Sequence, residues 1–341
     1  MPFDPDAAAA PGTGVFGLPF TREESRVILL PVPFDATTSY RRGTAAGPAA
    51  IREASAQVDL FDRAFGRIYE RGIFMEELPP EIIEANETAR AAADPIIEVG
   101  GIENMSNQAA GRALLAKVNA ACESVNEVVY VRTKRDLEEG KTPGLIGGEH
   151  STPFGAIRAC AEHFGGLGIL HIDAHMDLRE AFEGFAWSHA SIMHNVLTRI
   201  PKIDKVVQVG IRDFGERELA FAKEAGERID VMFDDELAES LLNGASWSAH
   251  CRQIIERLPH RVYVTFDIDA LDPSLCPHTG TPVPGGLSYH QATFLLDALR
   301  RSGKHIVGFD LVEVAPGDDS APEWDANVGA RVLYKLCGLA K

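Results

Sequence analysis

Three side chains that can bind a metal ion follow one apolar segment of the chain at alternate positions. Residues 167–172 are apolar apart from one histidine, and their length and composition predict a buried strand. Asp173, His175 and Asp177 come directly after this segment. Alternate side chains of an extended backbone share a face, so the three can converge just past the strand's carboxyl end, where open α/β sheets bind ligands. The pattern favours a metal site over a polar loop with a capping aspartate.

Other apolar segments also end in polar groups that can bind metal or a charged ligand. In chain order these are His150 after residues 144–148, Asp267 and Asp269 at the end of residues 261–269, and Glu313 at the end of residues 305–313. Burying several carboxylates together is very costly unless a cation neutralises them. Two histidines and four aspartates, without sulfur, suit manganese, nickel or iron better than structural zinc. Six ligands exceed the needs of one tetrahedral ion and fit two metals with bridging carboxylates.

Composition narrows the class of protein. The chain has 341 residues, of which 45% are hydrophobic and 24% charged, as in a globular protein with a sizeable core. No apolar stretch approaches the ~20 residues that span a bilayer, and no signal peptide is evident, so we expect a cytoplasmic protein without a membrane partner. The net charge of −17 argues against binding nucleic acid. Five scattered cysteines argue against a disulfide framework or a thiolate zinc site.

Segments that predict strands alternate with segments that predict helices. We expect strands at 26–33, 144–148, 167–172, 206–212, 261–269 and 305–313, and helices at 48–55, 81–93, 107–124, 216–226, 235–258 and 288–302. This alternation predicts a mostly parallel sheet with helices on both faces. No linker divides residues 15–341, so they are expected to form a single catalytic domain. Residues 1–14, rich in Ala, Pro and Gly, predict a flexible arm or one that orders against another subunit. Residues 74–106 carry no recognisable chemistry and predict a surface excursion or an oligomer contact.

Five ordered motifs resemble those of the ureohydrolases, the arginase and agmatinase family. They are residues 147–151 (Gly-Gly-Glu-His-Ser), 173–177 (Asp-Ala-His-Met-Asp), 267–274 (Asp-Ile-Asp-Ala-Leu-Asp-Pro-Ser), 279–286 (Thr-Gly-Thr-Pro-Val-Pro-Gly-Gly) and 312–316 (Val-Glu-Val-Ala-Pro). The early loop 34–52 matches too, and the resemblance runs from about residue 26 to the C-terminus. It implies a three-layer α/β/α arginase-like fold, two Mn²⁺ ions and a homo-oligomer, commonly a trimer or hexamer. Nickel (Ni²⁺) has nearly the same ligand preferences and remains an alternative.

The resemblance also implies how the six metal ligands divide. His150 and Asp177 would hold one ion, and His175 and Asp269 the other. Asp173 and Asp267 would bridge the two ions. A hydroxide between the ions would attack the guanidinium carbon of the substrate, since metal binding lowers the pKa of water toward ~7.

Two further residues match positions with a role in the family's chemistry. Glu313 resembles the glutamate that binds the substrate guanidinium, since a carboxylate and a guanidinium pair well. His189 lies where the family has a histidine that carries a proton to the leaving amine, and imidazole titrates near neutrality. We therefore expect His189, Asp177 and Glu313 to be catalytic. Glu313, His189 and Arg179 are the expected contacts to substrate. The alternative for His189 is a histidine that only starts a helix.

Residues 178–187 indicate the substrate, because this chain departs from the arginase pattern there. Arginases have polar residues there, including Asn and Ser, that recognise the amino-acid head of the substrate. This chain has Leu-Arg-Glu-Ala-Phe-Glu-Gly-Phe-Ala-Trp, which disfavours L-arginine. Agmatine, which lacks the carboxylate, becomes the first candidate, to be cleaved to urea and putrescine. Glu180 or Glu183 would contact its distal ammonium.

Arg179 keeps other substrates open. Asp-Leu-Arg after the metal motif also resembles formimidoylglutamases, although that branch usually lacks a histidine at the position of His189. A cation beside the pocket suits an acid such as guanidinobutyrate or guanidinopropionate. The alternative, which we favour, is an ion pair of Arg179 with Glu180, Glu183 or a neighbouring subunit. The aromatic residues of segment 178–187 could instead narrow the pocket for free guanidine.

Two other classes of protein are alternatives to a ureohydrolase. Deacetylases of the same fold use one zinc and an Asp-x-His pair, but the motif at His150 and the full aspartate set argue against them. A metal-stabilised regulatory oligomer without activity is the non-enzyme alternative. All six ligands and Glu313 are intact, which argues against it.

Overall fold

The computed structural model describes residues 3–10, 12–317 and 323–340. Its centre is a sheet in which every strand pair is parallel, with the order β2-β1-β3-β8-β7-β4-β5-β6. The strands are β1 (Val27–Val32), β2 (Ile73–Met75), β3 (Thr142–Gly147), β4 (Leu167–Ile172), β5 (Ile203–Ile211), β6 (Ile229–Phe233), β7 (Arg261–Asp267) and β8 (His305–Val312). The expected parallel sheet is confirmed. Strands β2 and β6 were not predicted, because both are short and lie at the edges of the sheet.

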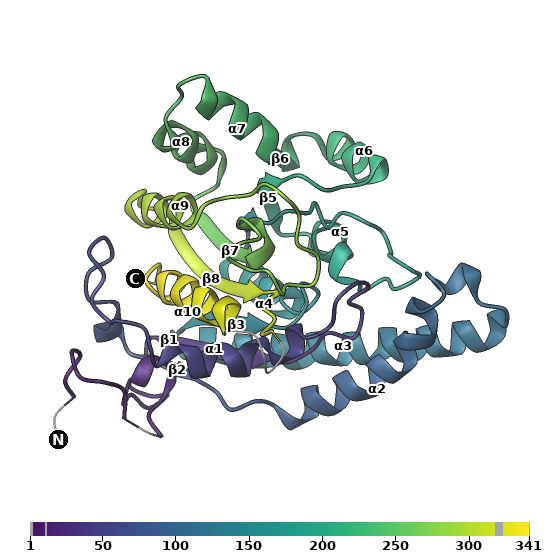
Figure 1. Ribbon diagram of the computed structural model, residues 1–341, viewed down its shortest axis with the longest axis horizontal. Coiled ribbons are helices and arrows are strands. Elements are labelled where there is room, and N and C mark those ends of the chain that lie inside the picture. Colours follow the sequence, from purple (N-terminus) through teal and green to yellow (C-terminus); the bar gives the residue numbers. More distant parts are fainter. Residues whose placement is uncertain (1–2, 11, 318–322, 341) are drawn as a thin grey trace.

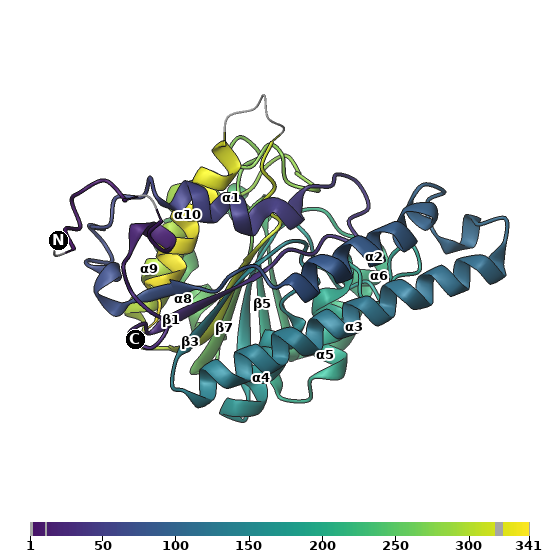
Figure 2. The ribbon, with the colours of Figure 1, turned by 90° about the horizontal axis from the view of Figure 1, so that it is seen from below.

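Helices cover both faces of the sheet, as Figure 2 shows. The helices are α1 (Gly47–Ser55), α2 (Pro80–Ile97), α3 (Gln108–Glu138), α4 (Phe154–Phe164), α5 (Ile192–Arg199), α6 (Glu216–Ala225), α7 (Asp234–Leu242), α8 (Trp247–Arg257), α9 (Tyr289–Arg301) and α10 (Trp324–Cys337). One apolar core cluster joins the sheet to α1, α8, α9 and α10, and a second joins it to α2, α3, α4 and α5. The three-layer α/β/α architecture is therefore confirmed.

Two helix predictions need correction, and one helix was missed. The segment 235–258 is two helices rather than one, because the chain turns at Gly244, whose φ of 92° suits glycine after a helix end. Helix α3 continues to Glu138 rather than ending near residue 124. Helix α10 was not predicted.

Helices α2 and α3 form a hairpin that extends past the end of the sheet (Figure 1). Residues 98–107 connect the two helices at the far end of this hairpin. Residues 74–106 thus contain most of β2 and all of α2, and an oligomer contact there stays a prediction.

The N-terminal segment lies against the domain through a few contacts. The ring of Phe3 is 6.4 Å from that of Phe20 and 6.1 Å from that of Tyr69, measured between centroids. Residues 1, 2 and 11 of the predicted arm lie outside the described residues. The division into an arm at 1–14 and one catalytic domain at 15–341 stays a prediction.

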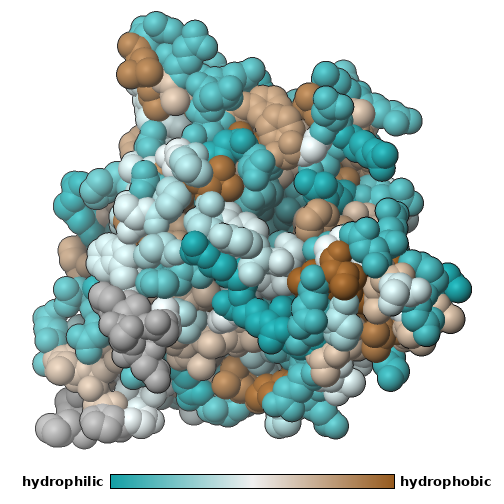
Figure 3. Space-filling model, turned by 45° about the vertical axis from the view of Figure 1, so that its right-hand side comes forward, coloured by the Kyte–Doolittle hydropathy of each residue, from teal (hydrophilic) through white to brown (hydrophobic). Residues whose placement is uncertain are grey.

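The described surface offers neither a membrane-spanning helix nor a broad apolar face in the view shown. None of the described helices combines the length and apolar character that crossing a membrane requires. On the face drawn in Figure 3, hydrophobic residues form small separate patches among hydrophilic ones.

The four central strands bring the predicted chemistry together. Strands β3, β8, β7 and β4 are consecutive neighbours in the sheet and, being parallel, end at the same edge. His150 follows β3, Glu313 follows β8, Asp267 ends β7, and Asp173 follows β4. The candidate site therefore lies at the carboxyl edge of the middle of the sheet, where such sheets bind ligands.

Candidate metal centre

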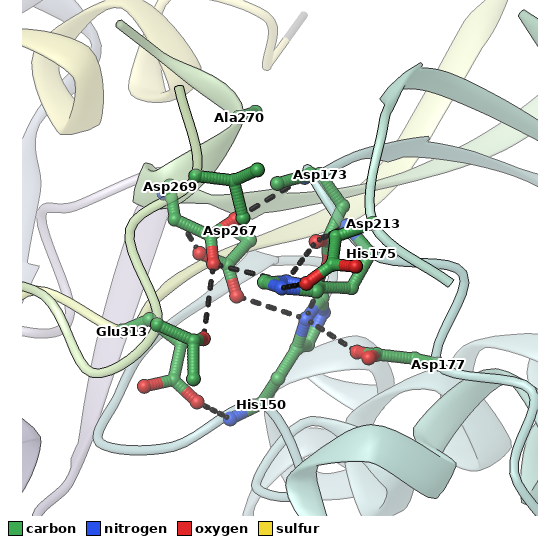
Figure 4. Close-up of polar contacts among 12 residues, drawn as sticks. His150, Asp173, His175, Asp177, Asp213, Asp267, Asp269, Ala270 and Glu313 are labelled. Atoms are coloured by element: carbon green, nitrogen blue, oxygen red, sulfur yellow. Dashed lines mark hydrogen bonds and ion pairs between the residues drawn. The ribbon is translucent and has the colours of Figure 1, made fainter. Parts of the chain in front are cut away.

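A first group of ligands surrounds the Nδ1 atom of His150. This nitrogen lies 2.9 Å from an oxygen of Asp173, 3.1 Å from one of Asp177 and 3.2 Å from one of Asp267. All four side chains are buried. Figure 4 shows that they point toward one another from the ends of three strands. His150, Asp173 and Asp177, with His171 behind them, offer ligand atoms within 4.8 Å of one another.

A hydrogen-bonded chain behind His150 sets which nitrogen faces the carboxylates. Thr265 donates its only hydroxyl proton to Asp310 at 2.7 Å. The hydroxyl oxygen can therefore only accept from His150, whose Nε2 lies 2.9 Å away. Nε2 therefore carries a proton, and in the neutral imidazole Nδ1 presents a lone pair to the three aspartates. Burial opposes a charged His150, but the three aspartates raise its pKa well above the usual range, so a proton or another cation is favoured at Nδ1. Nδ1 has no hydrogen-bond partner among the described residues. A buried lone pair facing carboxylate oxygens fits a cation between them.

A second group surrounds His175. Its Nδ1 lies 3.1 Å from an oxygen of Asp269 and 3.5 Å from the second oxygen of Asp173. Asp173 thus faces both groups, one oxygen toward each histidine. Asp267 contacts His150, while its other oxygen accepts the backbone N–H of Asp269 at 2.8 Å. Its assignment as a second bridge stays a prediction.

His171 supports the centre from within the sheet. Gln208 donates to its Nδ1 at 2.9 Å, so the Nε2–H of His171 donates to Asp173 at 2.7 Å. This contact gives His171 a supporting role. It also orients Asp173, since a carboxylate ligand held by a second hydrogen bond keeps its geometry.

The electrostatics of the cluster call for positive charge. Burial raises the pKa of Asp177 to about 6, and burial together with the charges of Asp269 and Asp173 raises that of Asp267 well above its usual range. Burial also opposes ionisation of Asp173, but the imidazoles of His171 and His150 hold its pKa well below the usual range. These carboxylates crowd one buried space, and divalent cations would remove their repulsion. The residues present fit two metal ions.

Glu313 stands beside the cluster with one oxygen free. Its Oε1 accepts the backbone N–H of His150 at 2.8 Å, while its Oε2 is buried and has no hydrogen-bond partner among the described residues. Burial, and then the charge of Glu149, raise the pKa of Glu313 well above its usual range. The φ of 61° at Glu313 is uncommon outside glycine, and such backbone is often found at functional sites.

His189 faces Glu313 across the same space. Its Nδ1 lies 3.7 Å from Oε1 of Glu313, and Ser39 lies 3.4 Å from its Nε2. Burial and the neighbouring His175 and His150 lower the pKa of His189 to about 3. This differs from the near-neutral titration expected from sequence, because the side chain is buried between other imidazoles. At neutral pH it is a neutral imidazole, and the lowered pKa makes it a weaker proton acceptor than the sequence suggests. The role of His189 as a proton carrier stays a prediction.

A cavity of about 150 Å³ opens from the cluster toward solvent. Arg179 and Asp213, whose side chains are 40% and 69% exposed, line its outer part, and Phe182, Glu218 and Thr281 line it as well. The Nε of Arg179 pairs with Glu218 at 3.5 Å, and its guanidinium lies 4.9 Å from the ring centroid of Phe182. The expected partners of Arg179 within its own loop were wrong, because α6 brings Glu218 closer.

Glu180 and Glu183 were expected near the substrate, but they are not among the residues that line this cavity. Asp213, which was not predicted, lies at the cavity with its side chain 69% exposed. Asp213 follows β5, whereas Glu183 accepts a hydrogen bond from the backbone N–H of Ile102, between α2 and α3.

Sequence reasoning also missed the support residues, which carried a readable signal. Thr265 stands two residues before Asp267 on the same strand, and it pairs in register with Asp310 on β8. Polar residues at alternate positions inside apolar strands share a face with the ligand that follows. Glu149 is another buried polar residue that supports the site, after Thr265 and Asp310. It is fully buried and accepts hydrogen bonds from Thr37, Thr38 and Ser151.

Comparison with known proteins agrees with this geometry. A family model described as the Arginase family matches residues 25–338. The N(1)-aminopropylagmatine ureohydrolase of Thermus thermophilus is 33% identical over 318 residues, covering 93% of this chain and 91% of that protein. The agmatinase of Bacillus anthracis is 31% identical over 322 residues, covering 94% and 93%. The solved structure of proclavaminate amidino hydrolase from Streptomyces clavuligerus has a TM-score of 0.75 at 25% identity, covering 98% of both chains.

The fold, the paired His/Asp groups and these matches define a metal-dependent amidino hydrolase. The chain belongs to the arginase family, and its named relatives lie on the agmatinase-like side. The resemblance read from the five sequence motifs is confirmed. The centre is a candidate site for two divalent metal ions.

Proposed function

We propose that this enzyme hydrolyses agmatine to urea and putrescine. The observation that carries the proposal is Glu313, which lines the cavity together with His150 and His175 and whose buried Oε2 has no hydrogen-bond partner in the described part of the chain. A guanidinium N–H donated to this oxygen would supply the missing partner and the positive charge that the carboxylate lacks. The names of the Bacillus and Thermus relatives support a substrate of the agmatine type.

The residues divide the chemical work as follows. Two divalent ions held by the six ligands would supply Lewis-acid activation of water. Glu313 would orient the guanidinium so that its carbon faces the metal ligands. The water oxygen adds to this carbon and becomes the carbonyl oxygen of urea. The C–N bond to the alkyl amine breaks, and the amine nitrogen gains both water protons and leaves as an ammonium group. His189, neutral and at the cavity wall, would accept a proton from the attacking water and deliver it to that nitrogen.

The outer cavity supports a substrate with a cationic tail. Glu218 pairs with Arg179, so the positive charge that suggested an acidic substrate already has a partner. Asp213 is an exposed carboxylate at the same end of the cavity and would contact the distal ammonium of agmatine. Because this end opens to solvent, the longer cation N(1)-aminopropylagmatine is the second candidate. The guanidino acids, formimidoylglutamate and guanidine rank lower.

We further propose Mn²⁺ as the native metal, with Ni²⁺ as the alternative, since both suit a mixed nitrogen and oxygen ligand set. A cytoplasmic homo-oligomer, a trimer or hexamer, follows from the family resemblance. Metal analysis of the purified protein and native mass spectrometry would test the metal and the oligomer number.

Urea release by the manganese-loaded protein tests the function. The substrates would be agmatine, N(1)-aminopropylagmatine, guanidinobutyrate, guanidinopropionate, formimidoylglutamate, arginine and guanidine, each also with nickel. We expect the highest kcat/KM with agmatine or its aminopropyl derivative, and no activity in Asp267→Asn. A preference for guanidinobutyrate would contradict the proposed substrate. Inactivity with the whole panel would instead favour the regulatory oligomer.

A further inference from the structure

A tight turn in the segment 178–187 shapes the outer wall of the cavity. Phe182 and Phe185 exchange backbone hydrogen bonds, at 3.2 Å in one direction and 2.8 Å in the other. The two residues between them, Glu183 and Gly184, have φ values of 53° and 99°. A two-residue hairpin loop with both φ values positive is a type I′ turn, and a glutamate in its first position is costly. Something outside the turn must hold it in place.

The tip of the α2–α3 hairpin, residues 98–107, contacts this turn directly. The backbone N–H of Ile102 donates to the carbonyl of Glu183 at 3.0 Å. A Cβ atom added at Gly184 would lie 2.6 Å from the side chain of Ile102, and one added at Gly101 would lie 3.2 Å from the Cα of Glu183. The two backbones therefore approach as closely as glycine allows. Ile102 itself packs against the apolar core cluster beneath.

The turn connects the tip of the hairpin to the wall of the cavity. Phe182 lies at its first end and lines the cavity, with the guanidinium of Arg179 stacked on its ring. At the other end of the segment, the indole N–H of Trp187 donates to Glu123 on α3 at 3.3 Å. The backbone N–H of Arg179 donates to Ala190, another lining residue, at 3.1 Å. The α2–α3 hairpin thus holds the segment at two points, Glu183 and Trp187. Arg179 and Phe182, which precede the first of these points, line the cavity.

We propose that the tip of the α2–α3 hairpin is a specificity-determining element, which positions Phe182 through Ile102 and the Glu183–Gly184 turn. Phe182 would pack along the methylene chain of a linear guanidino substrate, while the metal ligands and Glu313 act on the guanidinium. The part that concerns the substrate rests on the proposed function. The mechanical part, a hairpin that holds the cavity wall, does not depend on it.

Hydrogen–deuterium exchange of the manganese-loaded protein tests the mechanical part without substrate. Ile102→Ala removes the side chain that meets the turn, and Val99→Ala is the matched control, an exposed residue of the same tip. We expect amide exchange in residues 178–187 to rise about tenfold in Ile102→Ala, because the turn opens locally. It should stay unchanged in Val99→Ala. Equal exchange in the two variants would overturn the proposal.

Kinetics with agmatine test the specificity part. We expect Ile102→Ala to raise KM about three- to tenfold while kcat and metal content stay within about twofold, since the chemical centre is untouched.

Gly184→Ala should raise KM as well. In the double variant Gly184→Ala with Ile102→Ala, the 2.6 Å clash with the Ile102 side chain is relieved, while the strain of alanine at a φ of 99° stays. KM should therefore rise less than the two single effects predict together. A fall in kcat or metal content without a change in KM would overturn the specificity role. If wild-type protein does not hydrolyse agmatine, the proposed function fails and the exchange result still decides the mechanical part.

Discussion

At the scale of single residues, the centre depends on atoms whose partners are fixed from behind. Thr265 can only accept from His150 because its own proton goes to Asp310. Glu313 uses one oxygen to hold the backbone of His150 and keeps the other free. The ligand atoms therefore already face one another before any ligand arrives, which is the preorganisation that a metal site requires.

Glu313→Gln tests the carboxylate that faces the substrate. Glutamine still accepts the backbone N–H of His150, but it cannot offer a negative charge to a guanidinium. We expect kcat/KM for agmatine to fall about 100-fold or more, with both metal ions retained. Steady-state kinetics and metal analysis measure the two effects. Loss of metal in this variant would show that Glu313 supports the centre rather than the substrate.

Thr265→Val tests the chain behind His150. Valine has a similar shape but leaves the Nε2–H of His150 without an acceptor, so the imidazole loses its preferred orientation. We expect the affinity for one of the two metal ions to fall about 10- to 100-fold. Calorimetric titration with Mn²⁺ measures this change. Thr293→Val on α9 is the control, because the hydroxyl of Thr293 donates to backbone carbonyls of its own helix. This variant should bind Mn²⁺ as the wild type does. Unchanged affinity in Thr265→Val would rule out the orienting role.

At the scale of elements, close packing of strand ends positions the motif around His150. The backbone N–H of Gly148 donates to Val32 at the end of β1, and that of Glu149 donates to Phe34, each at 2.8 Å. A Cβ atom at Gly148 would lie 2.1 Å from the carbonyl oxygen of Phe34. The glycine is therefore required by the close approach of two chain segments.

Gly148→Ala tests this packing. The methyl group would force the segment after β3 away from β1, and the motif around His150 would move with it. We expect the free energy of unfolding to fall by about 2–4 kcal/mol, measured by urea denaturation, together with weaker metal binding. Wild-type stability in this variant would show that the strand ends can separate without cost.

At the scale of the whole molecule, the buried carboxylates oppose folding unless cations accompany them. Asp177 and Asp267 both have raised pKa values, which means that their ionised forms are destabilised in the folded protein without metal. Metal binding to the folded chain should therefore contribute to global stability as well as to chemistry.

Metal removal tests this coupling. A ligand that binds only the folded state at 100 times its Kd adds about 2.7 kcal/mol. We expect chelation to lower Tm by several degrees and Mn²⁺ to restore it, as followed by calorimetry. Asp173→Asn, which alters the carboxylate that faces both groups, should abolish the restoration. An identical Tm with and without metal would contradict the coupling.

The sequence was sufficient for the fold class, the family and the six candidate ligands. These rest on local signals: apolar segments of strand length, alternate side chains that share a face, and polar groups at the ends of those segments. Asp173, His175 and Asp177 could be identified because one strand presents all three. The partner of Arg179 could not, because Glu218 lies on a helix that sequence spacing does not bring near. The supporting pair Thr265 and Asp310 lies on two strands whose register is set by the assembled sheet.

Local patterns of residues are enough to predict which side chains can do chemistry and at which edge of a parallel sheet they lie. Which of these side chains meet depends on the folded molecule. The order β3-β8-β7-β4 joins strands that are far apart in the chain, and it alone places His150 among Asp173, Asp177 and Asp267. It also decided that His189 is buried and neutral, and that a distant helical hairpin holds the cavity wall. Burial and long-range contact are properties of the packed molecule, and no local pattern of residues contains them.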